Sequence, residues 1–227
     1  MKILIVGGYD GYETPFVGLG DITFDEDEFL AAPEDFGLLV FAGGEDVNPA
    51  FYGHTSPKHM CGYNTRRDVA EKELYDIAAK YNIKMTGICR GSQFLNVMAG
   101  GVMMHHITNH GVSHLMTTID GKDIQVTSTH HQMCMPAQHG HIMAWSSERR
   151  STVYYGDKDE QVKYTGREVE SIYYPKENIF AVQFHPEYMN RESAGFNWYR
   201  STVVDFLQLS EEEFTKKYLT KSLEATV

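Results

Sequence analysis

The amino-acid sequence predicts an α/β fold with a mostly parallel central sheet, helices on its flanks and a small antiparallel excursion. Three continuous apolar runs indicate strands buried on both faces, as in parallel sheets: Lys2–Val6, Phe36–Ala42 and Ile83–Ile88. Helical patterns lie on either side of the third run, over Arg67–Tyr81 and Arg90–Ala99.

Length and composition favour a single soluble domain, residues 1–227. The net charge of −11 argues against nucleic acid or an anionic membrane as the main partner. No apolar run approaches the length of a membrane span, and Met1–Val6 is too short for a signal peptide. The three cysteines do not make a disulfide framework, so we expect a reducing, cytoplasmic location.

In the N-terminal region, each of the first two predicted strands ends at a pair of glycines. The first strand ends in Gly7-Gly8, and residues 9–36 show only an acidic stretch without an assigned role, Asp25–Glu28, and the start of a short helix, Phe29–Ala32. The second strand runs into Gly43-Gly44-Glu45-Asp46-Val47-Asn48-Pro49. Backbone N–H groups at such glycines can form half of an oxyanion hole. On this feature alone, a plain turn is the favoured alternative.

A loop over residues 53–66 precedes the first long helix. Arg67–Tyr81 has an apolar face with helical spacing, formed by Ala70, Leu74, Ile77, Ala78 and Tyr81. Acidic side chains near its start suit the positive end of the helix dipole, namely Asp68, Glu71 and Glu73.

The third strand ends at Cys89, which stands between Gly87 and Gly91. Gly-X-Cys-X-Gly between a strand and a helix has the spacing of a nucleophile elbow, with Cys in place of Ser. The glycines let the backbone crowd in, and the N–H groups of the helix that starts at Arg90 favour the nucleophilic thiolate. The alternative is a buried structural cysteine, which would make both flanking glycines a coincidence.

Eight histidines lie between residues 102 and 141, namely His105, His106, His110, His114, His130, His131, His139 and His141. A zinc site could use His106, His110 and His114 on one helix face, but the residues between them are poor helix formers. No second ligand pair is spaced as in known zinc modules, so we expect no metal. Ile119–Thr129 alternates around Asp120-Gly121 and predicts an antiparallel hairpin.

Short strands follow at Met143–Ser146, Thr152–Tyr155, Val169–Tyr174 and Ile179–Phe184. The last strand leads into His185-Pro186-Glu187. Residues at i and i+2 of an extended chain project to the same side, so Glu187 can orient His185 as a base. The pair is weak evidence of function by itself. Its position after a buried strand makes it the best partner for Cys89.

The C-terminal region predicts two helices. Asn197–Leu209 carries apolar residues for packing, and Ser210 with Glu213 forms a capping box before a second helix.

Together these motifs resemble the class I glutamine amidotransferase superfamily, over roughly residues 1–206. The resemblance rests on Gly87-Ile88-Cys89-Arg90-Gly91-Ser92-Gln93 followed by Phe184-His185-Pro186-Glu187. It implies a flavodoxin-like fold. Finer features resemble the γ-glutamyl-γ-aminobutyrate hydrolase-like branch, peptidase C26: Gly43–Pro49 with Tyr52-Gly53, Arg67-Asp68, Asn96-Val97 with Gly100-Gly101, and Ser128–Gln132. The chain departs from that branch between its first two strands, where members have a full helix and strand.

The resemblance implies a Cys-His-Glu triad. Cys89 attacks the γ-carbonyl of a glutamine-like amide, His185 takes and returns the proton, and Glu187 holds the His185 ring. The backbone N–H groups of Gly44 and Arg90 stabilise the oxyanion, and a γ-glutamyl thioester forms.

The resemblance also implies a substrate pocket that needs no metal or organic cofactor. Gln93 matches the position that helps to hold the glutamyl part, and His130, His131 and Gln132 match the segment that lines the substrate side. A strand-end histidine pair with satisfied hydrogen bonds is an equal alternative for that segment.

Three functions fit this reading. The chain hydrolyses a small-molecule γ-glutamyl amide itself, or it is a glutamine amidotransferase subunit that supplies ammonia to a separate synthetase, or it is an inactive binding module. Family-level details favour the hydrolase. We expect no nucleic-acid or membrane partner, and a homodimer is among the open oligomeric states.

Overall fold

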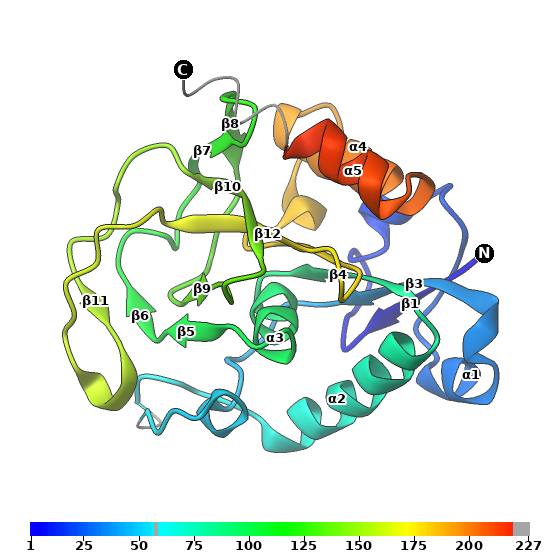
Figure 1. Ribbon diagram of the computed structural model, residues 1–227, viewed down its shortest axis with the longest axis horizontal. Coiled ribbons are helices and arrows are strands. Elements are labelled where there is room, and N and C mark those ends of the chain that lie inside the picture. Colours follow the sequence, from blue (N-terminus) through cyan, green and yellow to red (C-terminus); the bar gives the residue numbers. More distant parts are fainter. Residues whose placement is uncertain (57–58, 220–227) are drawn as a thin grey trace.

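The computed structural model describes residues 1–56 and 59–219, so positions 57–58 and 220–227 of the predicted domain lie outside it. Its centre is a nine-stranded sheet (Figure 1). From edge to edge the strands are β2 (Asp21–Thr23), β1 (Lys2–Val6), β3 (Phe36–Phe41), β4 (Lys84–Ile88), β13 (Ile179–Val182), β12 (Val169–Tyr174), β10 (His141–Ser146), β7 (His114–Thr118) and β8 (Asp123–Val126).

The sheet has a parallel half and an antiparallel half. Strands β2 to β13 in this order pair in parallel, and β13, β12, β10, β7 and β8 pair antiparallel. Two small sheets pair β11 (Tyr154–Tyr155) with β6 (His106–Ile107), and β5 (Val102–Met104) with β9 (Met133–Met135). The predicted α/β class is confirmed. The antiparallel part extends well beyond the expected hairpin, which is present as β7 and β8.

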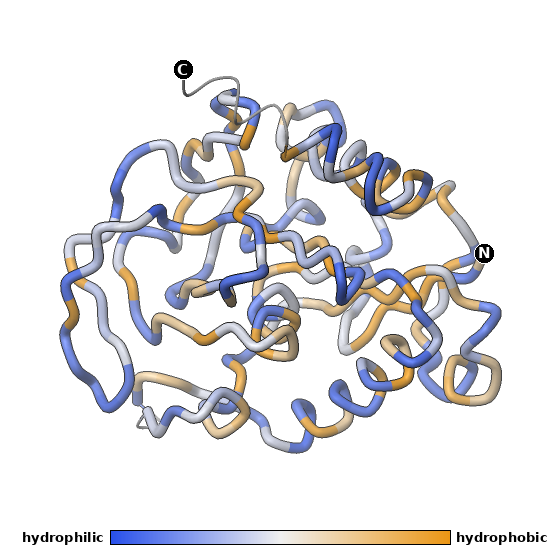
Figure 2. The backbone as a smooth tube through the Cα atoms, viewed as in Figure 1, coloured by the Kyte–Doolittle hydropathy of each residue, from blue (hydrophilic) through white to orange (hydrophobic). Residues whose placement is uncertain are grey.

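Helices cover both faces of the sheet. They are α1 (Glu26–Ala31), α2 (Thr65–Lys80), α3 (Arg90–Met98), α4 (Ala194–Gln208) and α5 (Glu211–Tyr218). Alternate residues of β3 pack to opposite sides: Leu39 joins the core under α2 and α3, and Val40 joins the core under α4 and α5. In Figure 1, α2 lies toward the bottom and α4 and α5 toward the top. In Figure 2, hydrophobic residues are concentrated on the central strands and hydrophilic ones on the outer loops.

The N-terminal region contains more structure than the sequence suggested. Asp25 caps α1 by accepting from the backbone N–H groups of Asp27 and Glu28, at 3.0 and 3.3 Å. The acidic stretch is therefore the cap and first turn of this helix, where negative charge favours the dipole. Strand β2 and the short α1 occupy the span between β1 and β3.

The prediction of which residues form the buried face of α2 is partly wrong. Ala70 and Tyr81 are exposed, whereas Asp68 and Glu71 are buried at 0% and 2% exposure. These two carboxylates do not sit in water near the helix dipole, because they face inward and pair with a buried arginine of α3.

Several boundaries also differ from the predictions. The predicted strand Thr152–Tyr155 shortens to β11. The predicted helix Asn197–Leu209 begins earlier, as α4 at Ala194, where Ser193 caps it. The Ser210–Glu213 capping box before α5 is confirmed. The histidines near residue 110 are not helical, since β6 and β7 flank them. Within residues 1–56 and 59–219, no helix combines the length and apolarity needed to cross a membrane.

The strand order brings distant segments together. Strand β4 lies between β3 and β13, with Gly87 opposite Phe41 and Ile88 opposite Val182. Because parallel strands end at the same sheet edge, the segments that follow them meet there. This edge is the usual ligand site of open α/β sheets.

Candidate active site

Cys89 occupies a strained turn between β4 and α3. Its backbone has φ +53° and ψ −109°, which side-chain-bearing residues rarely adopt. The flanking glycines are sterically required: a Cβ on Gly87 would collide with the backbone of Gly91, and a Cβ on Gly91 would collide with the carbonyl of Phe41. The packing of α3 against the strands therefore holds Cys89 in the geometry of an elbow.

His185 and Glu187 lie together after β13. The Nδ1 atom of His185 is 2.6 Å from Oε1 of Glu187, and both side chains are almost fully buried. The ring of Tyr188 stacks on the imidazole, with centroids 4.9 Å apart and planes 12° apart. The expected pair is thus present, with an orienting carboxylate on one side and an aromatic ring on one face.

Cys89 and His185 line the same cavity of about 600 Å³, a size common for small-molecule sites. Gly43 packs against both, because a Cβ placed on it would lie 3.2 Å from Cε1 of His185 and 3.6 Å from Cβ of Cys89. Burial lowers the pKa of His185, but hydrogen bonds and charge interactions with Cys89 and Glu187 outweigh it and raise this pKa to about 10. The imidazole therefore carries a proton at neutral pH.

Two further contacts of His185 were missed from the sequence. Its Nε2 atom is 2.8 Å from the hydroxyl of Thr129. Its backbone is tied to Thr127, whose hydroxyl donates to the His185 carbonyl at 2.7 Å and whose carbonyl accepts the His185 N–H at 3.1 Å. A hydroxyl residue in a loop carries no sequence signal for this role, since the contact joins segments far apart in the chain.

The candidate oxyanion-hole residues lie at the ends of β3 and β4. Gly44 lines the cavity with φ +148°, and Arg90 opens α3, where its N–H has no acceptor within the helix. The N–H of Gly43 donates instead to the hydroxyl of Tyr12, at 3.1 Å. Tyr12, another residue that sequence reasoning missed, thus fixes the turn that carries Gly44.

The side chain of Arg90 does not face the cavity. It is 1% exposed and pairs with Asp68 and Glu71 of α2. Burial lowers the pKa of Arg90 to about 10, so it stays charged at neutral pH and neutralises two buried carboxylates.

Arg67 connects this ionic network to the turn that contains Gly43. Its guanidinium bonds Glu71 at 2.6 Å and Glu45 at 3.0 Å, and donates to the carbonyls of Ala42 and Gly43 at 3.2 and 3.0 Å. Helix α2 therefore braces both the elbow and the glycine turn.

The candidate substrate-binding residues differ in their surroundings. Gln93 and His131 line the cavity, and Nε2 of His131 is 3.1 Å from Asp46. His130 also borders the cavity but is only 3% exposed, with its ring turned into the protein interior. Gln132 is fully buried and does not line the cavity. Gln93, His130 and His131 therefore lie at the cavity wall, and Gln132 lies behind it.

Two groups among the described residues have metal-ligand character. One is His54, His105 and Asp157, and the other is His110, His130 and Glu170. Neither lies between Cys89 and His185.

The family model of peptidase C26 matches residues 22–187, a stretch that contains the elbow and the His185–Glu187 pair. The chain belongs to the peptidase C26 family.

Several curated proteins are similar to part of the chain. Protein NtpR of Enterococcus hirae is 35% identical over 72 residues, which are 32% of this chain and 30% of NtpR. A "Putative glutamine amidotransferase" of Schizosaccharomyces pombe is 36% identical over 80 residues, 35% of this chain and 32% of that protein. The chain thus matches about a third of the length of these relatives. YvdE of Lactococcus lactis, named glutamine amidotransferase-like, is 25% identical over 165 residues, 66% of this chain and 65% of YvdE.

Solved structures share the fold. A glutamine amidotransferase of Thermotoga maritima superposes with a TM-score of 0.56 at 15% identity, covering 98% of this chain and 87% of that one. A protein of Thermoplasma acidophilum described as a "putative GMP synthase" subunit gives 0.56 at 18% identity, covering 96% of each chain. This peptidase C26 member is thus a member of the class I glutamine amidotransferase superfamily and has the fold of these structures.

Proposed function

We propose that this peptidase C26 protein hydrolyses the γ-glutamyl amide bond of a small molecule. The Cys89 thiolate attacks the γ-carbonyl carbon, and the oxyanion forms near the N–H groups of Gly44 and Arg90. The His185 imidazolium gives its proton to the leaving amine as the C–N bond breaks, which leaves a γ-glutamyl thioester. His185 then takes a proton from water, the resulting hydroxide attacks the thioester, and glutamate leaves as the thiolate is restored.

The observation that carries this proposal is that His185, held by Glu187, lines the same cavity as Cys89. A buried carboxylate holds the imidazole through Nδ1 at 2.6 Å, and Nε2, on the other side of the ring, contacts the hydroxyl of Thr129 at 2.8 Å. A positive imidazolium and the N-terminus of α3 both stabilise negative charge on an attacking sulfur. A binding module would gain nothing from an unfavourable backbone conformation at this cysteine.

A second candidate is a glutamine amidotransferase subunit whose ammonia serves a separate synthetase. The names of the relatives support it, and so does the likeness in fold to a structure described as PurLQS of Thermotoga maritima, with a TM-score of 0.54 at 14% identity. The chemistry at Cys89 is the same in both candidates up to the leaving group.

The test is glutamate release from glutamine and from a panel of γ-glutamyl amines. Release from γ-glutamyl amines that disappears in Cys89→Ala supports hydrolysis. Release from glutamine that rises when a synthetase is added supports the amidotransferase. Absence of release from every substrate, together with no labelling of Cys89 by a glutamine-analogue electrophile, would leave only a binding module.

Cys134→Ala is the matched control. Burial raises the pKa of Cys134 to about 12, and its sulfur faces Ser92 in the core at 3.9 Å. This cysteine should stay a thiol, escape labelling and leave glutamate release unchanged when replaced.

A further inference from the structure

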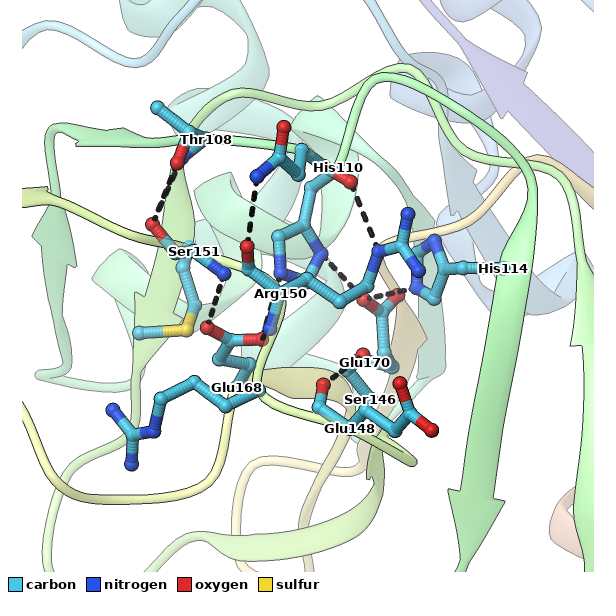
Figure 3. Close-up of polar contacts among 12 residues, drawn as sticks. Thr108, His110, His114, Ser146, Glu148, Arg150, Ser151, Glu168 and Glu170 are labelled. Atoms are coloured by element: carbon cyan, nitrogen blue, oxygen red, sulfur yellow. Dashed lines mark hydrogen bonds and ion pairs between the residues drawn. The ribbon is translucent and has the colours of Figure 1, made fainter.

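A group of histidines and glutamates lies buried outside the catalytic pair. We call it the His–Glu cluster, formed by His110, His114, His130, Glu168 and Glu170. Each member is at most 3% exposed. Figure 3 shows His110 and His114 pointing toward Glu170, with Glu168 on the opposite side of the His110 ring. The amide chemistry proposed above makes no use of these five side chains.

Each histidine of the cluster has one ring nitrogen on a hydrogen-bond acceptor. The acceptors are Oε2 of Glu168 at 3.0 Å from Nε2 of His110, the carbonyl of Val112 at 3.0 Å from Nδ1 of His114, and the carbonyl of Gln132 at 2.8 Å from Nδ1 of His130. A carbonyl can only accept. Glu168 is held as an anion by donors from Arg150, Ser151 and Tyr154. We call these three ring nitrogens the outer nitrogens and the other three the inner nitrogens. Because each outer nitrogen faces an acceptor, it carries the proton.

The three inner nitrogens converge on a single atom. Oε1 of Glu170 lies 3.1 Å from Nδ1 of His110, 2.9 Å from Nε2 of His114 and 3.4 Å from Nε2 of His130. In neutral rings these nitrogens present lone pairs to a carboxylate oxygen, which is repulsive. Two protonated rings, His110 and His114, would balance the two carboxylates, but Nε2 of His130 would still face Oε1 without a hydrogen bond.

A divalent cation removes this conflict. Three neutral imidazoles, two carboxylates and one M²⁺ sum to zero charge, and the lone pairs then have a Lewis acid to bind. Within the described chain, Oε2 of Glu170 and Nε2 of His130 are buried without a hydrogen-bond partner, so both have capacity for a ligand bond. The outer contacts match those of metal-binding histidines, which donate their second N–H to a carboxylate or a carbonyl.

We propose that His110, His114, His130 and Glu170 bind a divalent transition-metal ion of the zinc type. The ligand atoms of His110, His130 and Glu170 already lie within 4.8 Å of one another. Closing to Zn–N bonds of about 2.0–2.1 Å requires the carboxylate to rotate and the rings to approach by roughly an ångström. Glu168 is the outer partner that orients His110. The site is structural, and it departs from the sequence-based expectation of no metal.

The experiment uses the full chain without a polyhistidine tag and Zn²⁺ alone as the probe. Purified protein should hold one equivalent of Zn²⁺ through dialysis, and removal by a chelator should lower the melting temperature. His110→Gln and His130→Gln should lose this equivalent. Glu168→Gln should weaken binding roughly 10–100-fold, as loss of an outer partner does. His139→Gln is the matched control, because His139 is exposed and pairs with Glu177, which lies outside the His–Glu cluster.

X-ray absorption at the zinc edge of the wild type tests the site without any variant. Three imidazole nitrogens and one carboxylate oxygen in the first shell support the proposal. A first shell with only two imidazoles, together with loss of zinc in His54→Gln, would assign the ion to the group of His54, His105 and Asp157 and overturn it. Failure of the wild type to bind Zn²⁺ at all would overturn it equally.

Discussion

Replacing Glu187 by Gln should shift the pH dependence of catalysis. The Glu187 carboxylate meets Nδ1 of His185 at 2.6 Å in a buried site and helps to raise the pKa of this imidazole to about 10. A hydrogen bond to a charged group contributes about 1.5–3 kcal/mol, and one pKa unit corresponds to about 1.36 kcal/mol. Loss of the charge should therefore lower the pKa of His185 by roughly one to two units.

The direction of the pH dependence follows from the role of the His185 proton. The imidazolium is the acid that protonates the leaving amine, so activity is present below the pKa of His185 and lost as pH rises through it. The alkaline limb of kcat/KM should move from near pH 10 to about pH 8–9 in Glu187→Gln. The maximal rate should also fall by roughly 10²–10⁴, because a neutral amide orients the ring less strongly.

The assay is kcat/KM for glutamate release across pH, with imidazole titration followed by NMR. Glu177→Gln is the matched control, since Glu177 bonds the exposed His139 at 3.1 Å and should leave the alkaline limb in place. An unchanged limb in Glu187→Gln, with an unchanged imidazole titration, would refute the charged-pair argument.

Three smaller changes test the surroundings of the site. Thr129→Val removes the hydroxyl 2.8 Å from the catalytic imidazole, and kcat should fall by about 2–10-fold with KM unchanged. Gly91→Ala drives a methyl group into the carbonyl of a β3 residue, which should lower stability in urea unfolding by about 1–3 kcal/mol or prevent folding. Glu71→Gln leaves Arg90 short of buried negative charge and should cost about 3–5 kcal/mol in the same assay, whereas Glu73→Gln, exposed on the same helix, should cost almost nothing.

Local patterns were the part of the fold that the sequence could predict. The elbow is encoded within five consecutive residues, and each flanking glycine has a steric reason to be there. The His185–Glu187 pair is equally local, since two residues of one segment suffice to form it. The meeting of Cys89 with His185 is less local, because it depends on β13 pairing with β4, and the sequence indicates it only through the position of each motif after a buried strand and through the family resemblance.

The sequence did not reveal the buried ion pairs of Asp68 and Glu71, and the reason is physical. Acidic residues in the first turns of a helix usually face water, so Asp68 and Glu71 were assigned to the helix dipole. Their true partner, Arg90, belongs to the next helix and is itself buried. A usable signal did exist in β12, where Glu170 lies in a strand of mostly apolar residues, since a buried carboxylate needs partners of its own.

The segment that contains Thr129 and His130 contacts both the catalytic pair and the His–Glu cluster. Neighbouring residues of an extended chain point to opposite sides. Thr129 faces His185 at 2.8 Å, while His130 turns inward to within 3.4 Å of Glu170. Any displacement of His130 therefore moves the hydroxyl that contacts the catalytic imidazole. A cation bound by the cluster would fix His130 and, through the chain, Thr129. A metal ion that takes no part in the amide chemistry would thus still influence the position of the His185 imidazole.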